Sequence, residues 1–456
     1  MESRSPQSPK RVVASFPDLG REAVDRVVSE ARGSQIAWSS TPAPERARLL
    51  HACAAELSAA APEITALGIA EVGKPRGEMA AEVARGVSIL HYYADASLDA
   101  IGEVYPAPDQ PSLVFVRSRP RGVAGLITPW NFPVAIALWK AAPALAYGNA
   151  AICKPAPAAT GVALRLAALL DNHLPPGLFT VITGGTSTAE SLLDTADIIS
   201  FTGSVAAGHS VMARAASRGI PVQAEMGGQN PAIVLPDADV DRAAAAITGA
   251  AMGYAGQKCT ATSRIIIVGD DRGFTDALLA KVAHLTIGDP ADQDTVVGPV
   301  ISRGALESVL LAASTARAAG GRVLCGGSAL EEEGFYVEPT LVCGIEPHHP
   351  LAQEEIFGPF ALIFSASDVD EAVHIANDVK YGLAASVFTE DLDYAIDVSS
   401  RLDAGMIRVN APTTGVDFYT PFGGVKASSF GPREQGKAAR MFYTETQTLT
   451  IKPARE

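Results

Sequence analysis

The chain has 456 residues, which is too long for one ordinary hydrophobic core, so we expect two or three domains. Hydrophobic residues make up 48% of the chain and charged residues 19%, which excludes an intrinsically disordered protein. The formal net charge of −14 argues against a nucleic acid or an anionic membrane as partner.

The first part of the chain has mainly helical patterns. Residues 1–15 are polar and rich in Pro and Ser, and we expect them to be frayed. Apolar residues then recur at helical spacing over residues 20–32, 44–67 and 79–98. Pro62 is expected to divide the second of these runs into two helices, and residues 71–75 to form a turn. A short strand bounded by prolines is predicted at residues 113–116.

From residue 122 onward, strands alternate with helices. Strands are predicted at residues 122–127, 150–153, 179–182, 198–201 and 222–225. Helices are predicted at residues 139–147, 160–171, 188–193 and 205–217. This alternation is typical of a parallel sheet covered on both faces, in which ligands bind beyond the carboxyl ends of the strands.

A second α/β unit is predicted to begin at residue 228, after a Gly-Gly pair. It starts with an Ala-rich helix at residues 240–254, continues through a loop around Cys259, and enters a strand at residues 264–268. At the end of the chain, a Thr-rich alternation over residues 443–451 predicts another strand.

No targeting, membrane or metal-binding signal is apparent. Residues 1–10 lack the apolar segment of a secretory signal, and the apolar tract at residues 134–170 is interrupted by charged residues and prolines. The five cysteines are widely spaced and form no CxxC motif, so we expect neither a disulfide framework nor a metal site. We therefore expect a cytoplasmic protein.

Cys259 is the candidate nucleophile and Glu225 the candidate base. Cys259 lies in a glycine-flanked loop, and Glu225 precedes a Gly-Gly turn 34 residues earlier. A thiol and a carboxylate are the groups needed to attack a carbonyl carbon and then activate water. For Cys259 alone, the alternative is a small buried apolar residue.

Two further polar residues follow predicted strands. Asn131 could donate a hydrogen bond to a developing oxyanion, or it could cap a helix beside Pro133. Lys154 could hold a ribose hydroxyl or a phosphate, or it could be a solvated surface lysine.

Two small motifs could contact a dinucleotide. Gly203 and Ser204 lie at a strand-to-helix turn where backbone N–H groups can approach a pyrophosphate, although the GxGxxG fingerprint is absent. Glu355 could accept from ribose hydroxyls and Phe357 could pack near a nicotinamide, or the two could belong to a solvated acidic turn with a core phenylalanine.

Taken together and in this order, these stretches resemble the aldehyde dehydrogenase superfamily from about residue 24 to residue 452. The resemblance is carried by residues 71–75, 128–133, 154–156, 201–204, 225–228, 256–259, 354–359 and 421–424. It implies an α/β fold with a Rossmann-type parallel sheet for the cofactor, an α/β catalytic domain and small oligomerisation strands. The implied ranges are 1–100 and 121–227 for the cofactor domain, 228–440 for the catalytic domain, and 101–120 and 441–456 for the oligomerisation segment.

The resemblance also implies a role for each matching residue. Cys259 would be the nucleophile, Glu225 the general base, and Asn131 with the Cys259 N–H the oxyanion hole. Lys140 and Glu434 would relay protons around the base. The implied cofactor contacts are Ile127, Thr128, Trp130, Lys154, Ala156, Pro157, Gly203, Ser204, Gly227, Glu355 and Phe357. The implied substrate pocket contains Phe132, Lys258, Thr260, Phe418 and Phe422.

The implied reaction is the NAD(P)-dependent oxidation of an aldehyde to a carboxylic acid. The thiolate attacks the aldehyde carbon, hydride leaves for the nicotinamide, and a water activated by Glu225 hydrolyses the resulting thioester. Two alternative functions remain. Coenzyme A could take the acyl group in place of water, or the chain could be a non-catalytic structural or binding protein.

Three departures from the family pattern bear on details. Little sequence precedes Pro17, where relatives carry a hairpin. Pro157 stands where NAD-preferring relatives often carry a glutamate, so we expect NADP to be tolerated or preferred, with NAD the alternative. Residues 256–264 and 421–436 look most like the α-ketoglutarate semialdehyde dehydrogenase branch, which implies a short semialdehyde, yet residues 132–138 supply no arginine for its carboxylate.

The strands at residues 101–120 and 441–452 look like the family's oligomerisation strands, which extend a sheet across a subunit interface. We therefore expect a homodimer or a homotetramer.

Overall fold

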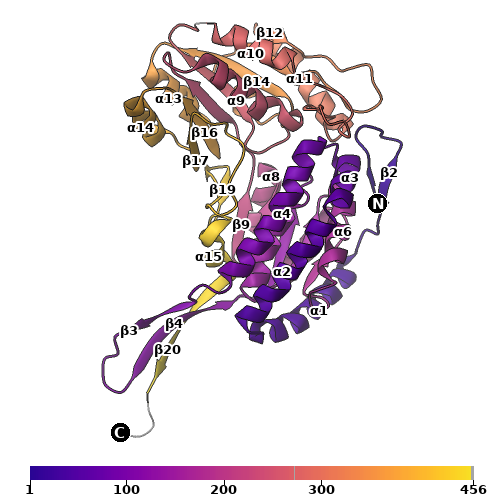
Figure 1. Cartoon of the computed structure of the whole chain (residues 1–456), viewed down its shortest axis with the longest axis vertical. Helices are drawn as coiled ribbons and strands as arrows, with labels where there is room; N and C mark the ends of the chain where they lie inside the picture. Colours follow the sequence, from indigo (N-terminus) through magenta and orange to yellow (C-terminus); the bar gives the residue numbers. More distant parts are fainter. Residues whose placement is uncertain (272, 453–456) are drawn as a thin grey trace.

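The computed structural model describes residues 1–271 and 273–452. It contains two α/β units and a projecting three-stranded sheet, which we call the arm (Figure 1). Among the described residues, none of the helices has both the length and the apolar character needed to cross a membrane.

The first unit is built on a six-stranded sheet in the order β19-β9-β8-β5-β6-β7, parallel except for β19. Its strands are β5 (Val123–Thr128), β6 (Ala150–Pro155), β7 (Phe179–Val181), β8 (Ile198–Thr202), β9 (Val222–Glu225) and β19 (Ser429–Phe430). Its helices are α1 (Arg21–Ser40), α2 (Ala43–Ala59), α3 (Ala61–Val72), α4 (Arg76–Ala96), α5 (Ala135–Ala146), α6 (Thr160–Leu170), α7 (Thr186–Thr195), α8 (Val205–Arg218) and α15 (Ala439–Tyr443), with short 3-10 turns η1 (Pro157–Ala159) and η3 (Gly436–Ala438). The predicted alternation of strands and helices is confirmed.

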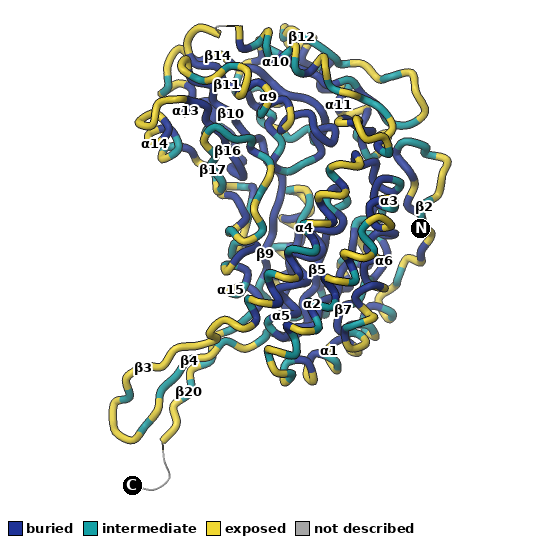
Figure 2. The backbone as a smooth tube through the Cα atoms, in the orientation of Figure 1, coloured by how far each residue is buried: buried dark blue, intermediate teal, exposed yellow. Residues whose placement is uncertain are grey.

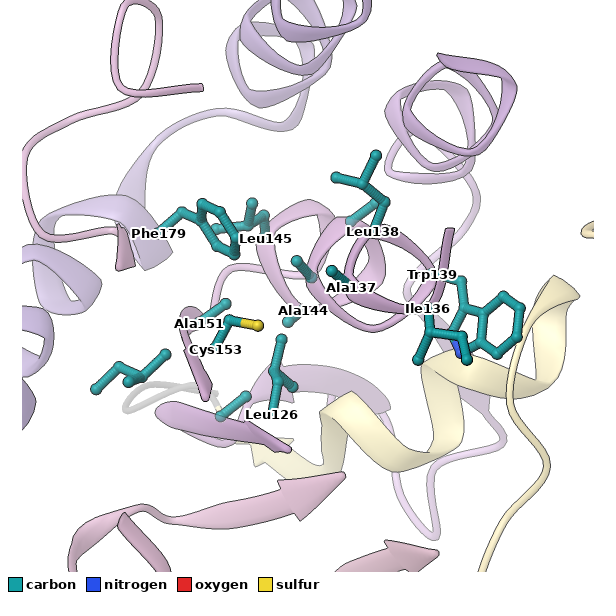
Figure 3. Packing of buried hydrophobic residues seen from close by; sticks show 14 of the residues in the cluster. Leu126, Ile136, Ala137, Leu138, Trp139, Ala144, Leu145, Ala151, Cys153 and Phe179 are labelled. Atoms are coloured by element: carbon teal, nitrogen blue, oxygen red, sulfur yellow. The ribbon is translucent and has the colours of Figure 1, made fainter. Parts of the chain in front are cut away.

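Helix α5 runs through the centre of this unit and is buried over its whole length. Figure 3 shows Ala144 and Leu145 facing Ala151 and Cys153 of β6, whereas Trp139 lies on the other side of the helix. The helix begins four residues before its predicted start because the Glu82 carboxylate of α4 accepts hydrogen bonds from the backbone N–H groups of Val134 and Ala135.

The second unit is built on a seven-stranded sheet in the order β12-β13-β14-β11-β10-β16-β17, parallel except for β12. Its strands are β10 (Asn230–Val234), β11 (Thr262–Val268), β12 (Arg322–Cys325), β13 (Thr340–Cys343), β14 (Phe360–Ala366), β16 (Ala384–Phe388) and β17 (Met406–Val409). Its helices are α9 (Val240–Met252), η2 (Gly253–Gly256), α10 (Phe274–Ala283), α11 (Arg303–Ala318), α12 (Pro350–Gln353), α13 (Val369–Asn377) and α14 (Leu392–Arg401), and a small pair joins β15 (Tyr381–Gly382) to β18 (Val425–Lys426). The predicted boundary at residues 227/228 falls between the two hydrophobic cores, and the domain ranges stay a prediction.

The prediction that residues 1–15 are frayed is wrong, because this short N-terminal segment forms an ordered hairpin. Strands β1 (Glu2–Arg4) and β2 (Val12–Ser15) pair antiparallel. Ser3 is only 1% exposed, and its hydroxyl donates to the buried Glu71 carboxylate at 2.5 Å. That carboxylate also accepts from the N–H groups of Gly161 and Val162. The Glu71 carboxylate therefore holds the Ser-rich N-terminal segment in place, although it lies 68 residues further along the chain.

The arm consists of β3 (Gly102–Tyr105), β4 (Leu113–Pro120) and β20 (Thr444–Ile451) in the order β20-β4-β3. The strands predicted at residues 113–116 and 443–451 are therefore confirmed as β4 and β20, and they pair with each other. Figure 2 shows that the arm is far more exposed than either unit. Val104 on the edge strand β3 is 74% exposed.

Candidate active site

The loop that carries Cys259 lies between η2 and β11. Tyr254, Ala255 and Gly256 have left-handed backbone conformations, with φ values of 54°, 51° and 65°. A Cβ at Gly256 would lie 2.2 Å from the carbonyl oxygen of Gly358, so only glycine fits this position. The strained turn holds Cys259, which is half-buried, in the wall of a cavity.

Asn131 reaches this loop from the turn between β5 and α5. Its side-chain Nδ2 donates to the carbonyl oxygen of Gln257 at 2.9 Å, two residues before Cys259. A side-chain amide has two N–H donors, so a second one stays available to a ligand. Asn131 is 3% exposed and does not cap α5, whose first N–H groups are bound by Glu82.

A buried ion pair fixes the turn that carries Asn131. The ammonium of Lys74 lies 2.6 Å from the Glu82 carboxylate and donates to the Asn131 carbonyl oxygen at 2.9 Å. It also lies 3.4 Å from the centre of the Phe132 ring. Because Glu82 binds the start of α5 as well, the pair ties α4 to both ends of this turn.

The pKa of the Cys259 thiol is raised to about 12, mainly by burial and in smaller part by the negative charges of Glu355 and Glu225. The backbone N–H groups of Cys259 and Thr260 act in the opposite direction and lower the pKa. With the chain alone, the sulfur is therefore a neutral thiol at neutral pH. A positive charge brought to the site would favour the thiolate.

Glu225 ends strand β9 and is 2% exposed. Ser429 faces it in the antiparallel pair of β19 with β9, and the Ser429 hydroxyl donates to Glu225 Oε2 at 2.5 Å. That hydroxyl accepts from the Gly424 N–H at 2.6 Å, so its own proton is directed at the carboxylate. Glu225 Oε1 is buried and has no partner among the described residues.

The pKa of Glu225 is raised well above its ordinary value by burial and by the neighbouring charge of Glu434. Ser429, Lys140 and Arg433 each lower it in part. Glu434 is paired with the Lys140 ammonium and accepts from Trp139 Nε1 at 2.7 Å. Lys140 also donates to Ser200 Oγ at 2.8 Å. Glu434, Lys140, Trp139 and Ser200 thus form one buried hydrogen-bonded cluster whose charges act on Glu225.

The predicted cofactor residues gather at one edge of the first sheet and at the loop that faces it. They lie at the end of β5 (Ile127, Thr128, Trp130), at the end of β6 (Lys154, Ala156, Pro157), between β8 and α8 (Gly203, Ser204), after β9 (Gly227) and after α12 (Glu355, Phe357). Since β6, β5, β8 and β9 are neighbours in the sheet, these residues share the carboxyl ends of the parallel strands.

This edge fits a dinucleotide. Lys154 is 6% exposed, is not a solvated surface lysine, and makes no hydrogen bond through its ammonium within the described residues; burial lowers its pKa. The Thr202 hydroxyl is likewise buried without a partner. These unsatisfied groups at the strand ends suit the hydroxyls and phosphates of such a cofactor.

Glu355 lies directly over the Gly-Gly turn. A Cβ at Gly227 would lie 2.1 Å from Glu355 Oε2, and the N–H of Gly228 donates to Glu355 Oε1 at 3.1 Å. Burial raises the pKa of Glu355 to about 7. Phe357 packs edge-on against Trp130, with ring centres 5.7 Å apart.

The cavity beside Cys259 has a volume of about 230 Å³. Phe132, Lys258, Thr260 and Phe422 of the predicted substrate pocket line it. Phe418 is not among the lining residues; it packs edge-on against Tyr92 at 5.8 Å between ring centres. Helix α4 contributes four lining residues that the sequence interpretation missed, which are Glu78, Ala81, Glu82 and Arg85.

Two signals could have revealed the missed residues. Positions 78, 81, 82 and 85 have the spacing of one helix face, and three of the four are charged. Ser429 lies in the stretch of residues 421–436 that carried the branch resemblance, five residues before Glu434. Lys74 lies in the stretch of residues 71–75 that carried the resemblance, whereas no local pattern marks Ser200, whose partner Lys140 lies 60 residues earlier in the chain.

The chain is similar to known proteins over nearly its whole length. Residues 1–449 match the model of the aldehyde dehydrogenase family. An alpha-ketoglutaric semialdehyde dehydrogenase from Bacillus subtilis (strain 168) is 38% identical over 458 residues, which cover 98% of this chain and 94% of that protein. A betaine aldehyde dehydrogenase from Cereibacter sphaeroides is 38% identical over 448 residues, which cover 96% of this chain and 91% of that protein.

The fold matches solved structures of the same class. The crystal structure of an NAD-dependent aldehyde dehydrogenase from Sinorhizobium meliloti superimposes with a TM-score of 0.96 at 32% sequence identity. The match covers 100% of this chain and 92% of that one.

Proposed function

The chain belongs to the aldehyde dehydrogenase family, and we propose that its substrate is a short aldehyde with a carboxylate at the other end. The protein is an NAD(P)-dependent aldehyde dehydrogenase. One observation carries the assignment of residues to the reaction. Cys259 lies in the wall of a small cavity, and both the Asn131 amide and the Glu225 carboxylate lie beside its loop.

In this proposal Cys259 is the nucleophile. Its thiol first releases its proton to solvent, and the thiolate sulfur then forms a bond to the aldehyde carbon, whose carbonyl oxygen becomes an oxyanion. The second N–H of the Asn131 amide and the backbone N–H of Cys259 donate to that oxygen. Lys74 and Glu82 hold the Asn131 turn rigid, so the donor is already oriented before the reaction.

The strand ends of the first sheet would hold the cofactor. Lys154 and Glu355 would bind a ribose, Ser204 a phosphate, and Trp130 and Phe357 would line the nicotinamide pocket. When bound, the nicotinamide supplies a hydride acceptor, which no side chain can provide. Gly227 is required there because any side chain would collide with Glu355.

Glu225 is the base for the second half of the reaction. Its partner-free Oε1 accepts a proton from the water that hydrolyses the thioester. Its raised pKa makes it a stronger base than an exposed glutamate once it has ionised. Glu434, Lys140 and Ser200 provide a buried route along which that proton moves on.

The acidic substrate is supported by three features. The B. subtilis relative is named for a semialdehyde that ends in a carboxylate. The cavity of about 230 Å³ is small compared with the roughly 300–1,000 Å³ pockets of drug-sized ligands, so it suits a short chain. Its wall includes an arginine, the side chain best suited to a carboxylate.

The test is reduced-nicotinamide formation by the pure protein with a panel of aldehydes. The panel contains α-ketoglutaric and succinic semialdehydes, pentanal and benzaldehyde, each with NAD and with NADP. We expect the acidic semialdehydes to give the highest kcat/KM, and NADP to be accepted because no acidic side chain stands at Pro157. Turnover of neutral aldehydes alone would contradict the substrate, and strict use of NAD would contradict the cofactor tolerance.

The arm supports a proposal about assembly. We infer that a second subunit pairs with its edge, giving a homodimer or a homotetramer. Strand β3 has an unpaired edge, and Val104, Tyr105 and Leu113 leave apolar surface in solvent.

A further inference from the structure

We propose that Arg85 binds the carboxylate of the substrate and thereby selects acidic aldehydes. This inference rests on the function proposed above, and it assigns the specificity for acidic aldehydes to one residue. Arg85 lies on α4, a helix to which the sequence assigned no functional role. It lines the same cavity as Cys259, so a molecule in the cavity can contact both residues.

One face of α4 forms a wall of the cavity. Glu78, Ala81, Glu82 and Arg85 all line it, and Lys258 from the cysteine loop is bound to Glu78. Arg85 is seven residues beyond Glu78, so it lies about 10 Å further along the helix axis. Arg85 therefore comes from the part of this wall that is further from Lys258 of the cysteine loop, where the far end of a short substrate would lie.

Arg85 is the cation of this wall whose charge no carboxylate neutralises. The Lys258 ammonium lies 2.7 Å from the Glu78 carboxylate, and the Glu82 carboxylate lies 2.6 Å from the Lys74 ammonium. Within residues 1–271 and 273–452, no carboxylate pairs with Arg85, whose hydrogen bond goes to the Val416 carbonyl oxygen. A guanidinium has five N–H donors, so several stay available to a ligand.

The rest of the cavity strengthens the preference for an anion. Phe132, Trp139, Val416 and Phe422 give it apolar walls, which exclude water and make a charge–charge hydrogen bond stronger. An unpaired cation in such surroundings favours a ligand that brings the opposite charge. A carboxylate also matches the guanidinium in shape, because two parallel N–H···O bonds can form.

The main alternative is that Arg85 only anchors the loop of residues 414–416, which lines the cavity. Arg408 offers a matched control, because its guanidinium donates to the carbonyl oxygen of Gly415, the neighbour of Val416. Arg408 is half-buried like Arg85 but does not line the cavity. Removing either guanidinium should loosen the same loop. Only the removal of the Arg85 guanidinium should also remove a group that binds the substrate carboxylate.

The experiment compares the wild type with Arg85→Met, Arg85→Lys and Arg408→Met. For each, kcat/KM is measured with α-ketoglutaric semialdehyde and with pentanal, which has the same chain length and no charge. The readout is the ratio of the two values. Circular dichroism and thermal unfolding establish that each variant is folded, and Arg85→Lys keeps the charge if Arg85→Met does not fold.

We expect the ratio to fall by about 10- to 100-fold in Arg85→Met, as for the loss of a charged hydrogen bond. The ratio should fall less in Arg85→Lys, and it should stay at the wild-type value in Arg408→Met. If the wild type prefers the acid and Arg85→Met keeps that preference, the inference is overturned and the proposed function stands. If the wild type itself prefers pentanal, the proposed function fails.

Discussion

The ion pairs of the catalytic centre are buried, whereas those of the arm are exposed to solvent. In the centre, the ion pairs Lys74–Glu82 and Lys140–Glu434 have side chains that are at most 2% exposed. In the arm, the side chains of the pair Arg119–Glu445 are 54% and 37% exposed. A buried charge that loses its partner is costly, whereas an exposed pair is screened by water. Single substitutions should therefore have large effects in the centre and small ones in the arm.

The largest effect is expected for Cys259→Ala. Removing the nucleophile should lower kcat at least about 1,000-fold, since covalent catalysis has no substitute at this position. The measurement is reduced-nicotinamide formation with the best substrate of the panel. Cys343→Ala is the matched control, because Cys343 is also half-buried and lies on β13 outside the cavity. Activity of Cys259→Ala within tenfold of the wild type would remove Cys259 from the mechanism.

Lys74→Met tests the contrast between buried and exposed ion pairs. It leaves the Glu82 carboxylate buried without its partner, so we expect the free energy of unfolding to fall by about 3–5 kcal/mol. The control is Arg119→Ala in the arm, which should cost less than about 1 kcal/mol. Both are measured by denaturant unfolding. Equal losses in the two variants would show that burial does not decide the outcome.

Ser429→Ala tests the environment of the base. The Ser429 hydroxyl stabilises the ionised form of Glu225 and so lowers its pKa, and removing it should raise that pKa further. Glu225 must be deprotonated to act, so the rising limb of the pH–rate profile should move to higher pH. At neutral pH we expect about a 10-fold loss of rate, the size of one charged hydrogen bond. Ser429→Thr keeps the hydroxyl and should restore the wild-type limb; an unmoved limb in Ser429→Ala would refute this role.

Val104→Lys is expected to have the smallest effect on catalysis and to act on assembly. A lysine on the exposed edge strand β3 would oppose pairing with another subunit. Light scattering after size-exclusion chromatography should give a smaller particle than the wild type, with kcat changed less than about twofold because the arm lies outside the cavity. An unchanged particle mass would argue that this edge forms no interface.

The sequence predicted the fold well where periodicity and turn residues decide the structure. The strands of the first sheet and the helices between them follow local patterns, and the predicted strand at residues 443–451 was found as β20. Predictions from local patterns were wrong where a side chain distant in the sequence determines the local structure. The early start of α5 depends on Glu82, and the order of residues 1–15 depends on the buried Glu71 carboxylate.

The residues of the site also divide into those that a local motif marks and those that only a distant contact brings to the site. Cys259, Glu225 and Asn131 lie in motifs with glycine or proline neighbours, which a sequence shows directly. Ser429 reaches Glu225 only through the pairing of β19 with β9, across 204 residues of chain. Arg85 becomes a candidate only when α4 is seen beside the cysteine loop. A local pattern can mark such a residue as a candidate, but the contact itself is made by the tertiary fold.

In the proposed mechanism, Cys259 carries the acyl group and Glu225 activates the water that removes it. Glu225→Gln separates these steps, because it keeps the shape of the side chain and abolishes the base. Mixed rapidly with cofactor and aldehyde, this variant should give a burst of about one reduced nicotinamide per active site, followed by turnover at least about 100-fold slower than in the wild type. Mass spectrometry of the quenched protein should find the acyl group on the Cys259 peptide. Steady turnover at the wild-type rate, or an acyl group on another residue, would contradict this mechanism.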